Sequence, residues 1–335
     1  MAGNAEPSTK LPSLHVVLLS ALLLGLTPSP SRAQDGKLLD SSPIKLTDDD
    51  VKTLESFRPE LGKIPDLLDR IDIKSITYLS DGLKVKGYLA IPKARKEGEK
   101  LPCVILNRGG NREFGALNDR RATAQLGRVA SWGYVVIASQ YRGNAGGEGK
   151  EEFGGKDVND VLNLIPLLES LPEADATRIG MEGWSRGGMM TYLALARTDR
   201  IAAAVVGAGA ADAFDIQKRP EMETEVYAQL IPNYATDKEA ALTARSAVRW
   251  PEKLCKKTPI LLLHGSADWR VDPTEALAMA TKLYETKHPF RFVFFEGGDH
   301  ALSEHRPEVD HLTKDWLDRY VRDKKPWPSL EPHGQ

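Results

Sequence analysis

Residues 179–197 read IGMEGWSRGGMMTYLALAR, and they pass from an apolar run to a serine between glycines and then to a helical pattern. The run at 179–184 is typical of a buried strand, and the segment at 186–197 is typical of a helix. A sharp turn between a strand and a helix leaves little room for side chains, which explains the glycines at 183 and 187. The stretch predicts either a nucleophilic Ser185 held clear of a sheet or a glycine-rich turn that contains a serine.

Short apolar runs alternate with helical patterns along most of the chain. The expected strands are 76–80, 83–91, 103–107, 134–139, 179–184, 201–206, 260–264 and 290–295. The expected helices are 48–57, 117–132, 158–171 with a kink at Pro166, 186–197, 273–286 and 308–321. Near-continuous apolar strands separated by helices indicate a mostly parallel sheet covered on both faces. Asp81-Gly82 between the first two runs indicates an antiparallel hairpin. We therefore predict an α/β protein with a mostly parallel eight-stranded sheet.

One segment, residues 207–257, interrupts this alternation. It follows the sixth expected strand, lacks a strand signal and carries charged, helix-like stretches. We predict a small helical excursion, similar to a cap, over the carboxyl ends of the strands, where α/β sheets bind ligands. The main domain is expected at 73–325, after a polar and partly helical extension at 34–72 and before a tail at 326–335.

The first 33 residues have a different composition. Lys10 precedes an apolar stretch at 14–26, and the small residues of Ser31-Arg32-Ala33 stand before Gln34. This order is typical of a secretory signal peptide, and the apolar stretch is shorter than the roughly 20 residues that span a bilayer. We predict a secreted or periplasmic protein without a stable membrane anchor, cleaved near Ala33; an uncleaved anchor is the alternative.

The overall composition limits the classes of partner. Hydrophobic residues make up 41%, charged residues 27%, and the net charge is −2, as in a globular protein with a real core. No basic stripe interleaved with aromatics is present, so no nucleic-acid partner is expected. No spacing typical of zinc ligands and no complete nucleotide-binding loop occurs, so neither a metal nor a cofactor is expected. Cys103 and Cys255 are expected to be structural thiols, with a single disulfide as the alternative.

A serine hydroxyl needs a base to remove its proton and an acid to orient that base. Asp268 follows the expected strand at 260–264, and His300 follows the one at 290–295, in the chain order Ser, Asp, His of an α/β hydrolase. Taken alone, each residue has a non-catalytic alternative: Asp268 could cap the following helix, and His300 could lie in a surface loop. Three members in order, each after a strand, favour a catalytic triad of Ser185, Asp268 and His300.

An oxyanion hole needs two backbone N–H donors. We expect one from Arg186 and one from Gly110 in the loop after the strand at 103–107, with Gly109 as a possible donor; a plain turn is the alternative. Three residues next to these in the sequence are expected to line a substrate pocket: Arg108, Trp184 and Trp269. For both tryptophans packing is the alternative, and a solvated position is expected for the Arg186 side chain.

Four stretches together resemble the catalytic domain of the prolyl oligopeptidase family of serine peptidases, in the α/β-hydrolase superfamily. They are YRGNAGG at 141–147, GKDVND at 155–160, RIGMEGWSRGG at 178–188 and HGSADWRV at 264–271. The resemblance implies an α/β-hydrolase fold with Ser185 as nucleophile, Asp268 as orienting acid and His300 as base. Two residues depart from the family pattern. The family usually has His or Tyr where this chain has Arg108, and Pro where it has Asp272. The family's peptidases usually carry a β-propeller, for which the extension at 34–72 is too short.

The sequence therefore predicts a secreted serine hydrolase that cleaves carboxyl esters or short peptide bonds through an acyl-enzyme. A small ester or peptide is the expected substrate. One alternative is an esterase similar to dienelactone hydrolases, with no peptidase activity. Another is an inactive hydrolase fold used for binding, which the complete set of Ser185, Asp268 and His300 disfavours.

Overall fold

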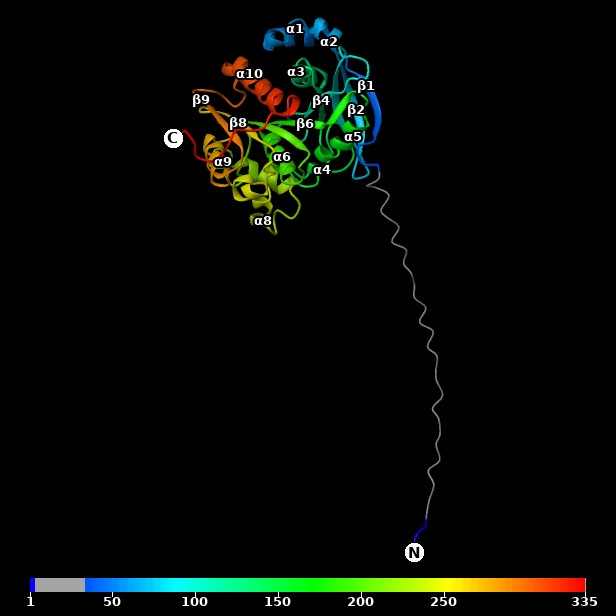
Figure 1. Cartoon of the computed structure of the whole chain (residues 1–335), viewed down its shortest axis with the longest axis vertical. Coiled ribbons are helices and arrows are strands. Elements are labelled where there is room, and N and C mark those ends of the chain that lie inside the picture. The colour runs from blue at the N-terminus through cyan, green and yellow to red at the C-terminus, as the bar shows by residue number, and fades with distance from the viewer. Residues whose placement is uncertain (4–33, 335) are drawn as a thin grey trace. The chain divides into compact units, whose positions relative to one another are not determined.

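A mixed sheet of nine strands in the order β1-β2-β3-β5-β4-β6-β7-β8-β9 forms the centre of the domain (Figure 1). The strands are β1 (Leu38–Pro43), β2 (Ile71–Ser80), β3 (Leu83–Pro92), β4 (Leu101–Asn107), β5 (Val135–Ser139), β6 (Ala174–Trp184), β7 (Ile201–Gly207), β8 (Ile260–Gly265) and β9 (Phe290–Phe295). Strands β4 to β9 run parallel, and β1, β2 and β3 pair antiparallel at one side. This computed structural model describes residues 1–3 and 34–334, so the predicted signal peptide falls almost entirely outside the described residues.

The predicted fold class is confirmed, and the strand count is corrected from eight to nine. The additional strand is β1, which lies in the N-terminal extension and pairs with β2. Five of its six residues are exposed, so no apolar alternation marked it as a strand. Its backbone covers what is otherwise the open edge of β2, and pairing of this kind does not depend on apolar side chains.

Helices cover both faces of the sheet. Successive residues of β4 point to opposite faces: Cys103 and Ile105 join one hydrophobic cluster, and Val104 and Leu106 join the other. The first cluster includes buried residues of α4 (Asp157–Leu162), α5 (Leu164–Ser170), α6 (Arg186–Leu195) and α9 (Pro273–Glu285). The second includes residues of α1 (Asp48–Phe57), α2 (Ile64–Arg70), α3 (Asp119–Ala130) and α10 (Arg306–Leu317). Figure 1 shows these two sets on either side of the strands.

The N-terminal extension packs into this same domain. Thr47 caps α1 by accepting a hydrogen bond from the Asp50 backbone N–H, and the Asp50 carboxylate accepts in return from the Thr47 N–H. After η2 (Pro59–Leu61), helix α2 buries Ile64 and Leu67 completely in the second cluster. The extension therefore contributes both a strand and core residues to the hydrolase fold.

The helix predicted over 158–171 is divided at Asn163 into α4 and α5. Pro166 lies in the first turn of α5 and has no N–H to donate to the Leu162 carbonyl one turn earlier. The predicted interruption is present, and it lies just before the proline.

Residues 208–257 contain no strand, as predicted, and form a chain of short helical segments. These are η3 (Met222–Tyr227), α7 (Ala228–Leu230), α8 (Lys238–Thr243), η4 (Ala247–Arg249) and η5 (Pro251–Lys253). Buried Tyr227 and Leu230 join the first hydrophobic cluster, which includes α6 and α9. The excursion is thus fixed against the face of the sheet that carries the helix after Ser185.

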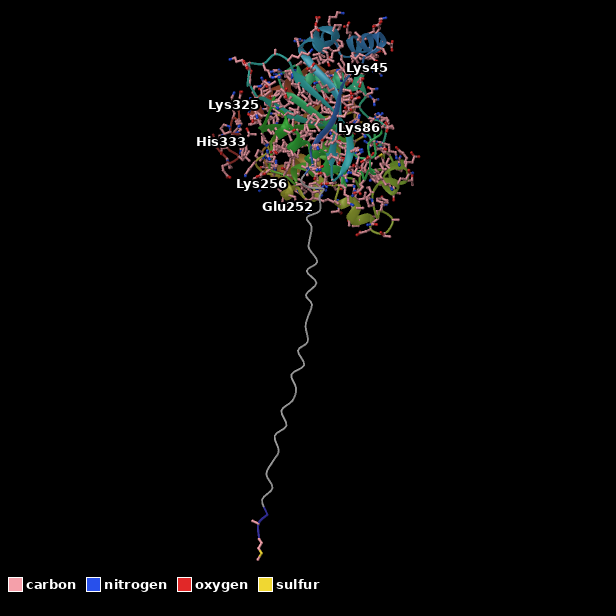
Figure 2. The ribbon with its side chains drawn as sticks, turned by 90° about the vertical axis from the view of Figure 1, so that its right-hand side faces the viewer. Lys45, Lys86, Glu252, Lys256, Lys325 and His333 are labelled. Carbon is pink, nitrogen blue, oxygen red and sulfur yellow. The ribbon has the colours of Figure 1, made fainter. Side chains whose placement is uncertain are left out.

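Charged side chains are spread over the surface of the domain. Lys45, Glu252 and Lys325 are exposed and lie on separate parts of it (Figure 2). Among the described helices, none combines the length and apolarity needed to cross a membrane. Cys103 and Cys255 are free thiols, and burial raises the pKa of Cys103 to about 12, which keeps that thiol protonated.

Candidate active site

Ser185 occupies a strained turn between β6 and α6. Its backbone has φ 60° and ψ −125°, a conformation that residues other than glycine rarely adopt. The surrounding backbone holds it there: the Ser185 N–H donates to the Gly207 carbonyl at 2.9 Å, and the Gly188 N–H donates to the Ser185 carbonyl at 2.9 Å. Strain of this kind costs on the order of 1–3 kcal/mol and places the hydroxyl at the top of the helix rather than within the sheet.

Two glycines make this turn possible. A Cβ atom at Gly183 would lie 2.1 Å from the Gly187 carbonyl oxygen, and one at Gly187 would lie 2.0 Å from the Asn107 carbonyl oxygen. Both distances are far inside van der Waals contact, so these positions admit only glycine. The close approach also brings the loop after β4 directly against the serine turn, because β4 and β6 are neighbours and Asn107 pairs with Gly183.

Asp268 and His300 meet at the carboxyl ends of β8 and β9. The His300 Nδ1–H donates to Asp268 Oδ2 at 2.8 Å, which leaves Nε2 as a proton acceptor. The other carboxylate oxygen, Oδ1, accepts from the backbone N–H groups of Arg270 and Val271 at 2.8 and 3.2 Å. The structure therefore brings the predicted acid and base together in the geometry that orients an imidazole.

A second histidine holds the same carboxylate and was missed by the sequence reasoning. His264 Nε2 lies 3.2 Å from Asp268 Oδ2 and 3.2 Å from the Val271 carbonyl oxygen. Because both partners are acceptors, this nitrogen carries the proton. Burial alone raises the pKa of Asp268, but the hydrogen bonds from His264 and His300 outweigh it and hold the pKa well below its usual range. Asp268 is therefore ionised at neutral pH.

Ser185 and His300 line one cavity of about 340 Å³. The Trp184 indole N–H donates to the His300 carbonyl at 2.7 Å, so the loop that carries the histidine is tied to the serine turn. The contacts of the described residues include no hydrogen bond between the Ser185 hydroxyl and the imidazole. Such bonds are often long in free enzymes and tighten when substrate binds.

The loop after β4 lies beside the nucleophile, as expected for an oxyanion hole. A Cβ atom at Gly109 would lie 3.2 Å from the Ser185 Cβ, so Gly109 is directly adjacent to the serine. Gly110 has φ 71°, and its Cβ position meets the Phe114 carbonyl at 2.1 Å. Of the two glycines, Gly109, which we predicted only as a possible donor, is the one placed against Ser185. The backbone N–H of Arg186 begins α6 immediately after the serine.

The three predicted pocket residues have different environments. Arg108 is buried, and its guanidinium donates to four backbone carbonyls: Gln140, Gly109, Phe114 and Arg112. Arg108 lines the cavity, but its hydrogen bonds brace the loop after β4. Burial, and to a smaller extent repulsion from Arg186, lowers the pKa of Arg108 to about 10. Trp184 lines the cavity beside Ser185. Trp269 is 60% exposed and lies outside the residues lining the two cavities at Ser185, which corrects the expectation for it.

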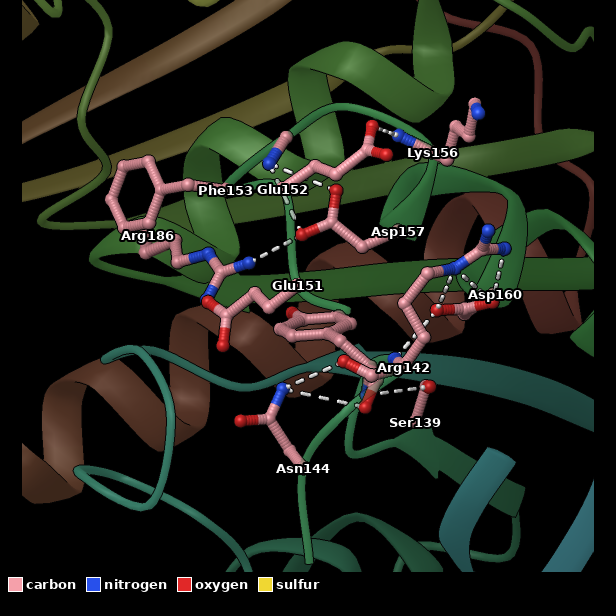
Figure 3. Close-up of polar contacts among 12 residues, drawn as sticks. Ser139, Arg142, Asn144, Glu151, Glu152, Phe153, Lys156, Asp157, Asp160 and Arg186 are labelled. Atoms are coloured by element: carbon pink, nitrogen blue, oxygen red, sulfur yellow. Dashed lines mark hydrogen bonds and ion pairs between the residues drawn. The ribbon is translucent and has the colours of Figure 1, made fainter. Parts of the chain in front are cut away.

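Arg186 is buried rather than solvated, contrary to our expectation. Its guanidinium forms ion pairs with Glu151 and with Asp157, the latter at 2.6 Å (Figure 3). The rings of Tyr141 and Phe153 lie 4.7 and 4.6 Å from its central carbon. One guanidinium nitrogen also donates to the Gly110 carbonyl at 3.0 Å, so this side chain connects the two loops that flank the serine.

A second ion pair supports the loop that follows β5. Asp160 is fully buried and accepts from the Arg142 guanidinium at 2.7 Å and from the Arg142 backbone N–H at 2.7 Å (Figure 3). This pair therefore ties the loop after β5 to α4.

Replacing Arg186 by Met is expected to lower the free energy of unfolding by about 3–5 kcal/mol, because Glu151 and Asp157 keep buried charges without their partner. Urea unfolding followed by circular dichroism measures this change. The exposed pair of Arg200 and Glu169 provides the matched control, since Arg200→Gln should cost no more than about 1 kcal/mol. A loss below about 1 kcal/mol for Arg186→Met would contradict the role assigned to the network.

A second cavity of about 100 Å³ also reaches Ser185 but does not include His300. It lies between α6, α9 and the excursion. Its acidic residues are Asp212, Asp215 and Glu275, and its basic residues are Arg186, Arg219 and Arg270. Its apolar lining consists of Phe114, Phe153, Met189, Ala210, Ala213, Ile216, Met222, Tyr227 and Val271. Phe153 and Tyr227 are in aromatic contact, with ring centroids 5.5 Å apart. This cavity is small, and apolar and charged side chains lie together in it next to Ser185.

Glu275 is buried beneath this second cavity. Its Oε2 accepts from the backbone N–H groups of Ala211 and Asp212, both at 2.8 Å, but burial dominates and raises its pKa from 4.5 to about 8. Between these two values the folded state holds a proton that the unfolded state releases, so this group makes folding less favourable as the pH rises.

The variant Glu275→Gln cannot titrate, and its stability relative to the wild type should increase by up to about 1.4 kcal/mol for each pH unit between about pH 5 and 8. Urea unfolding at several pH values measures the difference. Glu285→Gln, an exposed site on the same helix, should show no such trend. A difference for Glu275→Gln that is independent of pH would contradict the raised pKa.

The part of the chain described by the structure contains no group of three or more His, Cys, Asp or Glu side chains arranged to hold a metal ion.

Comparisons with known proteins agree with the fold and with the serine chemistry. The sequence profile of the prolyl oligopeptidase family matches residues 121–324. The uncharacterized peptidase YtmA of Bacillus subtilis is 29% identical over 261 residues, which cover 77% of this chain and 98% of that protein. Dipeptidyl-peptidase 5 of Porphyromonas gingivalis is 25% identical over 72% of this chain and 37% of its own length.

Two solved structures have the same fold. A puromycin-hydrolyzing peptidase of Mycobacterium tuberculosis superimposes with a TM-score of 0.61 and 26% identity, over 72% of this chain and 38% of that one. An acylaminoacyl peptidase of Pyrococcus horikoshii superimposes with a TM-score of 0.66 and 24% identity, over 81% of this chain and 45% of that one. The chain thus spans nearly all of YtmA and less than half of the other three relatives.

Proposed function

The chain belongs to the prolyl oligopeptidase family of serine peptidases, and from this premise we propose that it cleaves short peptide bonds and carboxyl esters through an acyl-enzyme on Ser185. The observation that carries the proposal is the hydrogen bond of 2.8 Å between His300 and Asp268 in a loop tied to the turn of Ser185. The imidazole is oriented by an ionised carboxylate and shares a cavity with a hydroxyl held outside the sheet.

The proposed reaction has two halves. His300 Nε2 removes the Ser185 proton while Oγ attacks the substrate carbonyl carbon, and the resulting oxyanion accepts hydrogen bonds from the Arg186 N–H and the Gly109–Gly110 loop. His300 then gives the proton to the leaving amine or alcohol as the bond to carbon breaks. Water attacks the acyl-enzyme with His300 again as base, and the acid product leaves. Asp268 stabilises the imidazolium in each half.

The size of the second cavity supports short substrates. A cavity of about 100 Å³ accepts a small side chain or a short acyl chain next to Ser185, and Phe153, Met189 and Tyr227 offer apolar contacts to it. A panel of p-nitrophenyl esters of increasing acyl length, assayed beside peptide anilides, tests this. Cleavage of short acyl esters is expected. Activity on peptides alone would contradict this expectation, activity on esters alone would support the esterase alternative, and no activity at all would favour an inactive binding protein.

We also propose that residues 1–33 direct export and are then removed. The support is the basic residue, apolar stretch and small residues of that segment, which together are typical of cleaved signal peptides. N-terminal sequencing of protein recovered from outside the producing cytoplasm is expected to begin at or near Gln34. Recovery of the intact N-terminus would contradict this proposal.

A further inference from the structure

Arginine is the commonest residue in the lining of the cavity that contains His300. Six arginines contribute to it, with Glu182 as the single acidic residue of the lining. The arginines are Arg58, Arg108, Arg121, Arg128, Arg270 and Arg306. The second cavity at Ser185 differs, since its three arginines are matched by three acidic residues, Asp212, Asp215 and Glu275. The lining that includes His300 therefore carries the larger formal excess of positive charge, six arginines against one carboxylate.

Four of the six arginines have no carboxylate partner among the described residues: Arg108, Arg121, Arg270 and Arg306. The guanidinium of Arg108 is bound by backbone carbonyls, as described above. Arg306 donates to the Ala301 carbonyl, next to His300, and its central carbon lies 5.6 Å from the centre of the Trp184 ring. Arg128, in contrast, is neutralised by Glu182 and by Asp310, the latter at 3.0 Å. The cavity thus retains an excess of positive charge near His300.

Arg58 and Arg306 come from opposite ends of the chain and lie close enough to repel each other. Burial lowers the pKa of Arg306, and the neighbouring charges of Arg58 and Arg128 lower it further, while Asp310 and Glu182 act in the opposite direction. Arg58 pairs with Glu60 through Nε, while its buried Nη2 has no hydrogen-bond partner among the described residues. Like charges gathered at a cavity wall and an unused buried donor are both stabilised when an anion binds.

The position of His300 identifies the part of the substrate that occupies this cavity. During acylation the imidazole protonates the leaving group, so the leaving group lies on the side of Ser185 where His300 lies. The cationic cavity includes His300 and Ala301, and the second cavity includes neither. The acyl part of the substrate accordingly faces the second cavity, and the leaving group faces the arginines.

We propose that the enzyme prefers substrates whose leaving group carries a carboxylate, which Arg306 and Arg58 bind beside His300. The inference rests on the proposed hydrolase function and specifies its substrate class. The bond that breaks joins the acyl carbon to the leaving nitrogen or oxygen, which takes the proton from His300, and water completes the hydrolysis. In a peptide the carboxylate is either the free C-terminus of the departing residue or its acidic side chain.

Substrates that share the same acyl group and differ only in the charge of the leaving group test this preference. Two N-acetylalanyl esters differ only in the phenol, 4-hydroxybenzoate against 4-hydroxybenzamide, and their rates are normalised to spontaneous hydrolysis. Three peptides distinguish the sources of charge: acetyl-Ala-Gly with a free C-terminus, its amide, and acetyl-Ala-Asp amide. The full chain is expected to show kcat/KM at least about tenfold higher for the carboxylate-bearing ester, the gain typical of one charge-assisted contact. For peptides, whichever carboxylate source reaches the arginines should show the same gain.

Variants assign the preference to its residues. Arg306→Gln and Arg58→Gln are each expected to lower the carboxylate-to-amide ratio of kcat/KM about tenfold, Arg306→Lys less, and the control Arg200→Gln not at all. The wild type gives an independent measurement if a variant fails to fold, because raising the salt concentration should reduce the ratio through screening. Two results would overturn this inference while leaving the proposed function intact. One is hydrolysis of both esters at equal normalised rates, and the other is a carboxylate-to-amide ratio of kcat/KM that changes neither with salt nor in the two Gln variants. Hydrolysis of neither ester, with no labelling of Ser185, instead overturns the proposed function.

Discussion

Replacing Ser185 by Ala is expected to abolish ester and peptide hydrolysis and to remove covalent labelling by a fluorophosphonate probe. The expected loss in kcat is about a millionfold, the size found when the nucleophile of a serine protease is removed. The physical reason is that only the Ser185 hydroxyl is held by the strained turn at the position where His300 and the adjacent glycine loop converge. Mass spectrometry of the probe adduct, together with single-turnover assays, measures the effect.

The variant Ser185→Gly provides a control for folding. Glycine adopts φ 60° without the steric cost that serine and alanine carry, so this variant should be as inactive as Ser185→Ala and at least as stable as the wild type. Thermal unfolding compares the three proteins. A Ser185→Ala protein that is folded and still labelled would falsify the assignment of the nucleophile.

The second large effect is expected at Asp268, where replacement by Asn should reduce kcat by about 10⁴-fold. The amide has nearly the same size as the carboxylate that it replaces, but it no longer stabilises the imidazolium and allows His300 to adopt the wrong tautomer. The pair Asp268→Asn and Asp272→Asn is well matched, because Asp272 lies four residues later, caps α9 and pairs with Lys218 at 2.5 Å. Steady-state kinetics should show only a small change for Asp272→Asn. Equal losses in both variants would contradict the orienting role of Asp268.

Asp268→Asn should also change how the free energy of unfolding depends on pH. The pKa of Asp268 is lowered in the folded state, so its carboxylate stabilises the fold above the unfolded value of about 3.9, and this contribution disappears as the pH falls further. The difference in unfolding free energy between the wild type and Asp268→Asn should therefore be largest near neutral pH and should shrink below about pH 4. A difference that grows in acid would show that the carboxylate is not held ionised by His264 and His300.

The sequence was informative wherever function depends on order along the chain. Ser185, Asp268 and His300 each follow a strongly apolar strand, and parallel strands place such residues at one edge of a sheet. The position of His264 was not predictable in this way, because it belongs to the apolar pattern of β8 itself. Its side chain bonds to Asp268 only because of the turn that follows that strand.

Other features depend on contacts between distant segments. Arg186 looked like a surface arginine in sequence, since its two partners, Glu151 in a loop and Asp157 at the start of α4, are about 30 residues away and follow no periodic pattern of charge. β1 was missed because its stability comes from backbone pairing rather than from buried side chains. Trp269 was misplaced because proximity to Asp268 in sequence does not fix the direction in which a large side chain points from a loop.

The contact between Gly187 and the Asn107 carbonyl also determines when the protein becomes reactive. These residues are far apart in the chain, and the serine turn adopts its strained form only against a strand that has already paired. Asp268 and His300 follow β8 and β9, which must also pair in the sheet before the acid and the base can reach the serine. A newly made or partly unfolded chain accordingly carries an ordinary, unreactive serine. The reactivity expected of Ser185 is therefore a property of the assembled sheet rather than of the serine itself, and separation of β8 or β9 from the sheet should be enough to abolish it.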